Sequence, residues 1–249
     1  MPKFFVDTNR INNNNITIIG TDVNHIKNVL RLKEKETLEI CNQDTQENYL
    51  CEIENISESK IQCSIIEKLS KNSESNIEVT IFQGLPKSDK MELIIQKGVE
   101  LGAYSITPVE MARCVVKLNG KDKAKKIDRW QKISEVAAKQ CGRDTIPKIN
   151  EIITIKDIIE EIKKYDVIIV AYEKEKENTI KKELKQIKKN GLTKIGIVIG
   201  PEGGLEEKEV ETLKCNGAKI ITLGKRILRT ETAALNILSN IIYELEIED

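Results

Sequence analysis

The 249-residue sequence predicts an α/β protein in which a small β-barrel precedes a larger domain built on a parallel sheet. Short β-type segments separated by Asn-rich or charged turns fill the first 70 residues. After residue 77, apolar strands alternate with helical patterns, as in α/β domains. Residues 70–76 contain no apolar side chain, which indicates a linker. We therefore expect one domain at residues 1–70 and a second at residues 71–249.

Several segments of the first domain alternate apolar with polar residues, the period of a half-buried strand. Five strands are expected, at residues 3–7, 15–20, 37–42, 48–56 and 60–69. One helix interrupts them at residues 22–32, with Ile26, Val29 and Leu30 on one side. A barrel of about 70 residues accommodates this set.

The second domain begins with the strand at residues 77–84 and continues through strands expected at 105–109, 166–172, 194–200 and 219–224. Helices are expected between them, one with Met91, Ile94, Ile95 and Val99 on its inner face. A long basic helix follows, with Trp130 on its apolar stripe. That place favours a core position for Trp130 over a platform that stacks on RNA bases. Further helices end near Lys189 and begin at Glu206, and the last helix begins near Thr230.

Charge is distributed unevenly, although 40 basic and 40 acidic residues cancel. Residues 113–143 contain ten basic and three acidic residues, a density that favours contact with RNA phosphates. The alternative is that this stretch is a solvated helix face.

Six Cys residues contain no CxxC pair and only one His is present, so no metal site is expected. Scattered free thiols are typical of a reducing compartment and predict a cytoplasmic protein. No apolar run approaches the roughly 20 residues that would span a bilayer, so no membrane association is expected.

Three loops are expected at the same edge of the second domain's sheet, where ligands of open α/β sheets bind. They are IGPEGG at residues 199–204, LGKRILRTETA at residues 223–233, and VAYEKE at residues 170–175. The glycines of the first loop permit close approach of backbone to a ligand. Alternatively, they only make a tight turn between a strand and a helix.

The loop lacks the features of a phosphate site. Leu205, Glu206 and Glu207 follow its last glycine where a P-loop needs Lys and Ser or Thr, and no GxGxxG occurs. The only His, His25, lies in the other domain, which argues against a serine–histidine hydrolase. The loop suits a ligand that carries no phosphate and is bound by backbone N–H and carbonyl groups. S-adenosylmethionine (SAM) fits that description.

IGPEGGLEEKE together with LGKRILRTETAAL resembles two motifs of the ribosomal RNA small subunit methyltransferase E family, in the SPOUT superfamily of trefoil-knotted methyltransferases. The segments KFFV, HIKNVLRLK, QGLPKSDKMELIIQKGVELG and RWQKISEVAAKQCGR extend the resemblance, in order, over nearly the whole chain. Lys225 departs from the pattern, since Pro is usual there.

The resemblance implies a PUA-like barrel that binds RNA and a SPOUT methyltransferase domain that contains the knot. It implies SAM-dependent methylation of N3 of a uridine in the decoding region of 16S rRNA, within the small ribosomal subunit. A homodimer is implied too, and the last helix has more apolar positions than one sheet face needs. The donor pocket is expected to consist of Ile199, Gly200, Gly203, Leu223, Gly224, Leu228, Arg229 and Thr230.

Arg229 is the candidate that stabilises the uridine anion, because it lies beside the donor loop. Its alternative role is an ion pair with a carboxylate such as Glu231. Glu202 and Glu231 are both candidates for the general base, and either could instead cap loop amides. The expected RNA contacts are Arg31, Lys87, Lys90, Arg113, Lys121, Lys123, Lys125, Lys126 and Arg143.

Two other functions are compatible with these motifs. A SPOUT methyltransferase could act on another RNA position, such as a tRNA ribose 2′-hydroxyl, with the same donor loops. The protein could also be a relative that binds RNA but has lost catalysis. The intact GPEGG and LRTETA motifs argue against this second function.

Overall fold

The computed structural model describes residues 2–70 and 73–246. The chain divides into two compact units, Met1–Glu74 with Ala138–Ile146, and Ser75–Ala137 with Pro147–Asp249. Part of the linker expected at residues 70–76, namely residues 71–72, lies outside the described residues.

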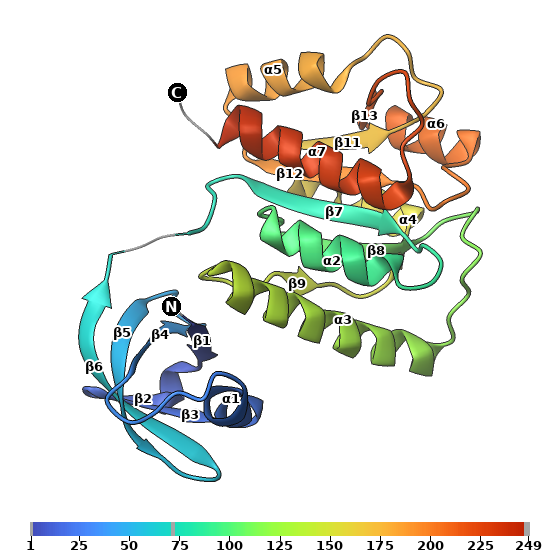
Figure 1. The fold of residues 1–249 in the computed structure, drawn as a ribbon. Coiled ribbons are helices and arrows are strands. Elements are labelled where there is room, and N and C mark those ends of the chain that lie inside the picture. The colour runs from blue at the N-terminus through green and yellow to red at the C-terminus, as the bar shows by residue number, and fades with distance from the viewer. Residues whose placement is uncertain (1, 71–72, 247–249) are drawn as a thin grey trace. The chain divides into compact units, whose positions relative to one another are not determined.

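The first unit contains a six-stranded sheet in the order β1-β4-β5-β6-β3-β2 (Figure 1). The strands are β1 (Lys3–Val6), β2 (Ile11–Asn12), β3 (Asn15–Ile19), β4 (Thr37–Asn42), β5 (Asn48–Ile56) and β6 (Lys60–Leu69). β1 pairs with β4 in parallel, and the other pairs are antiparallel. The inward-facing residues of this alternating pattern form one apolar core that includes Ile16, Ile18, Leu38 and Ile40.

The helix expected at residues 22–32 is shorter and less regular than predicted. α1 (Thr21–Asn24) continues into one π-helical turn, η2 (His25–Val29). Ile26 is buried as expected, but Val29 is 65% exposed and Leu30 is also exposed. The i→i+5 pattern of the π turn changes the angular spacing of residues, so the positions after Ile26 leave the face that a regular helix would give them.

The second unit is a parallel sheet in the order β10-β8-β7-β12-β11-β13, with β9 paired to β8. Its strands are β7 (Glu78–Gly84), β8 (Ser105–Glu110), β9 (Lys148–Ile149), β10 (Ile153–Thr154), β11 (Val167–Ala171), β12 (Lys194–Ile199) and β13 (Lys219–Ile221). The central strands are Ile- and Val-rich and buried on both faces, as parallel strands between helical layers must be. The predicted α/β class with a parallel sheet is confirmed.

Helices cover both faces of this sheet (Figure 1). They are α2 (Lys90–Glu100), α3 (Gly120–Cys141), α4 (Ile155–Glu161), α5 (Ile180–Asn190), α6 (Glu207–Cys215) and α7 (Thr230–Leu245). α7 packs on β7 and β12 and contacts α2 and α5, while α4 contacts α6. Trp130 of α3 is buried, as its place on the apolar stripe predicted.

Strand order brings distant segments together at one edge of the sheet. β12 lies between β7 and β11, so the loop after β12 is adjacent to the end of β7, more than 100 residues earlier in the chain. The carboxyl ends of β11, β12 and β13 are also neighbours. The three loops singled out in the sequence therefore meet, as expected for parallel strands.

Candidate functional site

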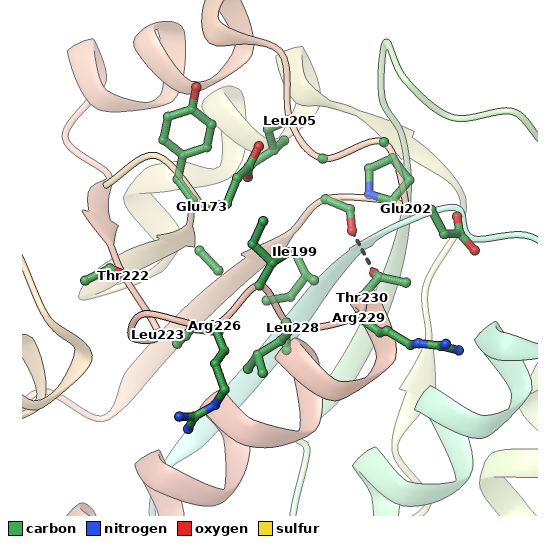
Figure 2. Close-up of a pocket in the computed structure, with 18 of the residues that line it drawn as sticks. Glu173, Ile199, Glu202, Leu205, Thr222, Leu223, Arg226, Leu228, Arg229 and Thr230 are labelled. Atoms are coloured by element: carbon green, nitrogen blue, oxygen red, sulfur yellow. Dashed lines mark hydrogen bonds between the residues drawn. The ribbon is translucent and has the colours of Figure 1, made fainter. Parts of the chain in front are cut away.

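A cavity of about 530 Å³ lies at the carboxyl ends of β11, β12 and β13 (Figure 2). Every residue predicted for the donor pocket lines it: Ile199, Gly200, Gly203, Leu223, Gly224, Leu228, Arg229 and Thr230. Two loops that lie about 20 residues apart in sequence thus line the same cavity. A concave site with apolar side chains and a few polar groups is the usual form of a small-molecule site.

Further lining residues were not named from the sequence. The β11–α5 loop contributes Tyr172 and Glu173, and Leu205 and Ala233 add apolar surface. Figure 2 shows Glu173 among the side chains that surround the cavity. The loop that contains Glu173 was expected at this edge of the sheet, but the sequence did not indicate which of its side chains line the cavity. Arg226 also lines the cavity, and it lies within the LGKRILRTETA loop.

The glycines of the 199–204 loop allow the chain to fold closely on itself. A Cβ on Gly200 would lie 2.9 Å from the carbonyl carbon of Gly204, and Gly204 has a φ of +69°. A hydrogen bond of 2.9 Å from the Gly204 N–H to the Pro201 carbonyl closes the turn. The tight-turn interpretation therefore accounts for these two glycines, and the turn itself forms the wall of the cavity.

Gly84, at the end of β7, makes a contact that the sequence did not indicate. A Cβ there would lie 2.7 Å from both the nitrogen and Cδ of Pro201 and 2.8 Å from the sulfur of Met111. Only glycine leaves room for the loop to cross the strand end at this distance. The signal, a glycine ending a buried strand, is present in the sequence, but its partner is 117 residues away.

Charged side chains form a cluster at the cavity, which Lys90 and Glu202 of this cluster line. The Lys90 ammonium lies 2.9 Å from Glu202 Oε1 and 3.6 Å from Glu231 Oε2. Burial acts to raise the pKa of Glu202, but hydrogen bonds from Lys90 and from the Lys87 N–H outweigh it and hold this pKa below its ordinary value. Glu202 is therefore a paired carboxylate. The Glu231 Oε2 atom is buried and accepts no hydrogen bond among the described residues.

Arg229 is exposed, and within residues 2–70 and 73–246 its guanidinium has no ion-pair partner. The alternative role considered for it, an ion pair with Glu231, is not formed, because Glu231 faces Lys90 instead. In Figure 2 the Arg229 and Glu202 side chains point to the same side, away from the apolar part of the cavity.

The predicted RNA contacts are distributed over both units. Arg31 is exposed on the first unit, and Lys121 and Lys125 are exposed on α3. Lys123 pairs with Glu110 at 2.9 Å, and Lys126 lies over the Trp130 ring, 6.0 Å from its centroid. Lys87 and Lys90 are at the charged cluster described above.

Two arginines from the basic stretch have hydrogen-bond partners within the protein, although Arg113 remains exposed. Arg113 Nη1 donates a 2.9 Å hydrogen bond to the carbonyl of Gly203, so its side chain holds the loop of the cavity. Arg143 is buried and its Nε donates to Glu74 at 3.1 Å, within the first unit. The sequence showed their charge but gave no sign of these partners, which are distant along the chain.

No group of three or more His, Cys, Asp or Glu residues among those described is arranged to hold a metal ion. Within the same residues, no helix is long and apolar enough to cross a membrane.

Comparison with known proteins assigns the class of this fold and site. Residues 73–242 match the family model of an RNA methyltransferase domain, and residues 18–66 match that of an RNA methyltransferase PUA domain. The fold, the cavity and these matches together define an RNA methyltransferase with an N-terminal PUA domain.

The particular family follows from individual relatives. Ribosomal RNA small subunit methyltransferase E of Bacillus subtilis is 42% identical over 234 residues, which are 93% of this chain and 91% of the relative. The Neisseria gonorrhoeae protein of the same name, solved with S-adenosyl methionine, is 28% identical, with a TM-score of 0.84 over 97% of each chain. A Legionella pneumophila methyltransferase solved with its cofactor SAM is 26% identical, with a TM-score of 0.87 over 99% of this chain and 98% of that one. The chain belongs to the ribosomal RNA small subunit methyltransferase E family.

Proposed function

We propose that this protein transfers a methyl group from SAM to N3 of one uridine in the decoding region of 16S rRNA. The observation that carries the proposal is the cavity at residues 199–204 and 223–233, in a chain 42% identical to a ribosomal RNA small subunit methyltransferase E. Two solved relatives of the same fold bind SAM, which supports the donor. Action on the small ribosomal subunit would place the reaction in the cytoplasm.

The residues of the cavity suit this donor. The apolar side chains of Ile199, Leu205, Leu223 and Leu228 offer surface for an adenine ring, and the glycine loop offers backbone groups for hydrogen bonds. No phosphate has to be neutralised, which agrees with the acidic residues that follow the loop. When bound, SAM supplies an electrophilic methyl group on a sulfonium.

Methyl transfer to N3 requires that the uridine loses its N3 proton. The bond from N3 to the methyl carbon forms while the sulfur–carbon bond breaks, which leaves a neutral thioether, and the proton passes to a base. We assign Arg229 to stabilise the uridine anion, because it is exposed at the rim of the cavity and has no other described partner.

Of the two candidates for the general base, Glu231 suits the role better because of its hydrogen bonding. Glu202 already accepts hydrogen bonds from Lys90 and from the Lys87 N–H, and its lowered pKa makes it a weak base. Glu231 has an oxygen with no hydrogen bond among the described residues. In this scheme Lys90 holds both carboxylates in place, which gives it a role at the catalytic cluster as well as toward RNA.

RNA contacts are assigned to exposed basic residues of each unit. On α3 these are Lys121 and Lys125, with Lys123 and Lys126 beside them in sequence, and on the barrel it is Arg31. We also propose that the working form is a homodimer in which α7 contributes to the interface.

The test is methylation of small subunits taken from cells that lack the corresponding gene, followed by mass spectrometry of the digested 16S rRNA. One N3-methyluridine in the decoding region is expected. A methyl group on a tRNA ribose or at another rRNA position would assign a different SPOUT substrate. RNA binding without SAM binding in calorimetry would show a non-catalytic relative.

A further inference from the structure

A buried glutamine outside the cavity lining connects two segments that do line it. Gln83, the penultimate residue of β7, is fully buried. Its Nε2 donates a 2.8 Å hydrogen bond to the Thr230 hydroxyl, and that hydroxyl donates a 2.7 Å hydrogen bond to the Gly200 carbonyl (Figure 2 shows the second bond). The chain Gln83–Thr230–Gly200 thus joins the central strand, the start of α7 and the glycine loop.

The direction of each hydrogen bond in this chain is determined. A hydroxyl has a single proton to donate, and Thr230 gives it to Gly200. The Thr230 oxygen can then only accept a hydrogen bond from Gln83. The Gln83 amide nitrogen is the donor of that bond. Without that donor, the Thr230 hydroxyl is free to rotate and the Gly200 carbonyl loses a fixed partner.

The same amide group also holds the strand end that the loop crosses. Gln83 Nε2 donates a 2.9 Å hydrogen bond to the carbonyl of Gly84, the residue against which Pro201 lies. Both points at which the 199–204 loop rests, Gly84 and Thr230, are therefore hydrogen-bonded to one buried nitrogen.

The stability of the fold does not by itself explain a glutamine at this position, because of its carbonyl oxygen. Oε1 is buried and has no hydrogen-bond partner among the described residues. An unpaired buried oxygen destabilises the folded state, so an apolar side chain of the same shape would avoid that loss. What the amide adds is the placement of Thr230 and Gly84.

From this geometry we infer that Gln83 is a positioning residue for donor binding, acting through Thr230 on the backbone of the Gly200 loop. The inference rests on the proposed function, since it takes SAM as the ligand of the cavity. Because the loop presents backbone groups, a shift of a few tenths of an ångström alters its hydrogen bonds to the ligand while the fold is kept.

The test compares Gln83→Met and Thr230→Val, singly and together, by calorimetric titration with SAM and by steady-state methylation. Each single variant should bind SAM about three- to tenfold more weakly, the range expected when one hydrogen bond is removed. The KM for SAM should rise while kcat at saturating SAM changes little. The double variant should be no weaker than the weaker single variant, because both changes break one chain.

Two further variants keep the result interpretable. Thr80→Val removes a buried hydroxyl that pairs with Ser105 Oγ at 3.0 Å in the same strand region, and it should leave SAM affinity unchanged. Thr230→Ser keeps the hydroxyl and should bind nearly as the wild type does. If Gln83→Met does not fold, Gln83→Leu takes its place, and the comparison of Thr230→Val with Thr230→Ser tests the Thr230–Gly200 hydrogen bond alone.

Wild-type SAM affinity in Gln83→Met, or equal affinities of Thr230→Val and Thr230→Ser, would overturn the inference. So would losses of the two single variants that multiply in the double variant, since independent effects would then explain them. A wild-type protein that binds no SAM would instead refute the proposed function.

Discussion

Arg113 shows how one residue can carry the charge of an RNA contact and serve another purpose. Its position in a basic stretch predicted phosphate binding, yet its guanidinium donates to the Gly203 carbonyl at 2.9 Å. A Cβ on Gly203 would lie only 3.0 Å from the Arg113 Cβ, so the two segments pack closely. The two residues are 90 positions apart in the sequence, so local sequence patterns do not reveal this contact.

We therefore predict that Arg113→Ala weakens SAM binding about three- to tenfold, because the hydrogen bond is exposed and supports the loop from outside the cavity lining. RNA affinity should change little. Calorimetry with SAM and a filter-binding assay with 16S rRNA measure the two effects separately. Reduced RNA affinity with unchanged SAM affinity would restore Arg113 to the RNA surface.

At the scale of elements, strands and long helices were predictable because their apolar periods are strong. The strand expected at residues 194–200 is β12 (Lys194–Ile199), and the last helix begins at Thr230 as predicted. α4, β9 and β10 were missed, although Thr154 and Asp157 form a capping box that signals the start of α4. The insertion of β12 between β7 and β11 could not be derived, since hydrophobic period does not encode strand order.

The site was predictable to the extent that it depends on loops after parallel strands. Ile199 and Leu228 were found because their loops end at one sheet edge. Gln83 and Gly84 were not found, because their roles depend on contacts with residues more than 100 positions away. The trefoil knot stays a prediction from family resemblance.

The exposed lysines of α3 allow a test of the basic stretch. Replacing Lys121 and Lys125 by Gln should weaken RNA binding and flatten its dependence on salt, because fewer counterions are released when fewer phosphates are neutralised. Replacing Lys123 and Lys126 should have smaller effects, because Glu110 and Trp130 already hold their side chains.

Binding isotherms at several salt concentrations give the slope, and SAM affinity serves as the control for intact folding. Equal slopes for the wild type and the Lys121 and Lys125 double variant would show that this face of α3 is only solvated.

At the scale of the whole chain, the first unit contains a buried ionic cluster that predicts sensitivity to acid. Lys3 pairs with Asp144, and Arg143 pairs with Glu74. Burial acts to raise the pKa of both carboxyls, but hydrogen bonds from Lys3 to Asp144 and from Arg143 to Glu74 outweigh it and leave both pKa values lowered. A lowered folded-state pKa contributes stability above the unfolded pKa, and this contribution is lost as pH falls through the folded value.

The free energy of unfolding should therefore decrease as pH falls below about 4.5, where these carboxyls begin to take up protons in the unfolded chain. Glu74→Gln should lower stability at pH 7 by about 1–3 kcal/mol and make the decrease below pH 4.5 shallower. Urea titrations at pH 7, 5 and 3 measure this, and hydrogen exchange in β1 and β4 localises it. A slope identical to that of the wild type would contradict a role for Glu74.

Most apolar positions of α7 are buried by packing within its own unit. The surplus of apolar positions in α7 predicted a second subunit, but α2 and α5 account for much of it. Ala233, Ala234, Ile237, Leu238 and Ile241 are buried within the unit. What remains is Tyr243, 70% exposed, with Leu235, Ile242 and Leu245 half-buried.

Tyrosine is enriched at protein interfaces, where its ring is buried and its hydroxyl group forms a hydrogen bond. Since Thr230 at the start of α7 lines the cavity, a partner seated on this helix would lie within about 20 Å of the donor site. We predict a dimer in sedimentation at micromolar concentration, and Tyr243→Glu should shift it toward monomers that keep their fold and lose activity. Ile66→Glu, a charge placed on an exposed residue of β6, should leave the dimer intact. A fully active monomer of 28.3 kDa would contradict the dimer requirement, because the site would then be complete within one chain.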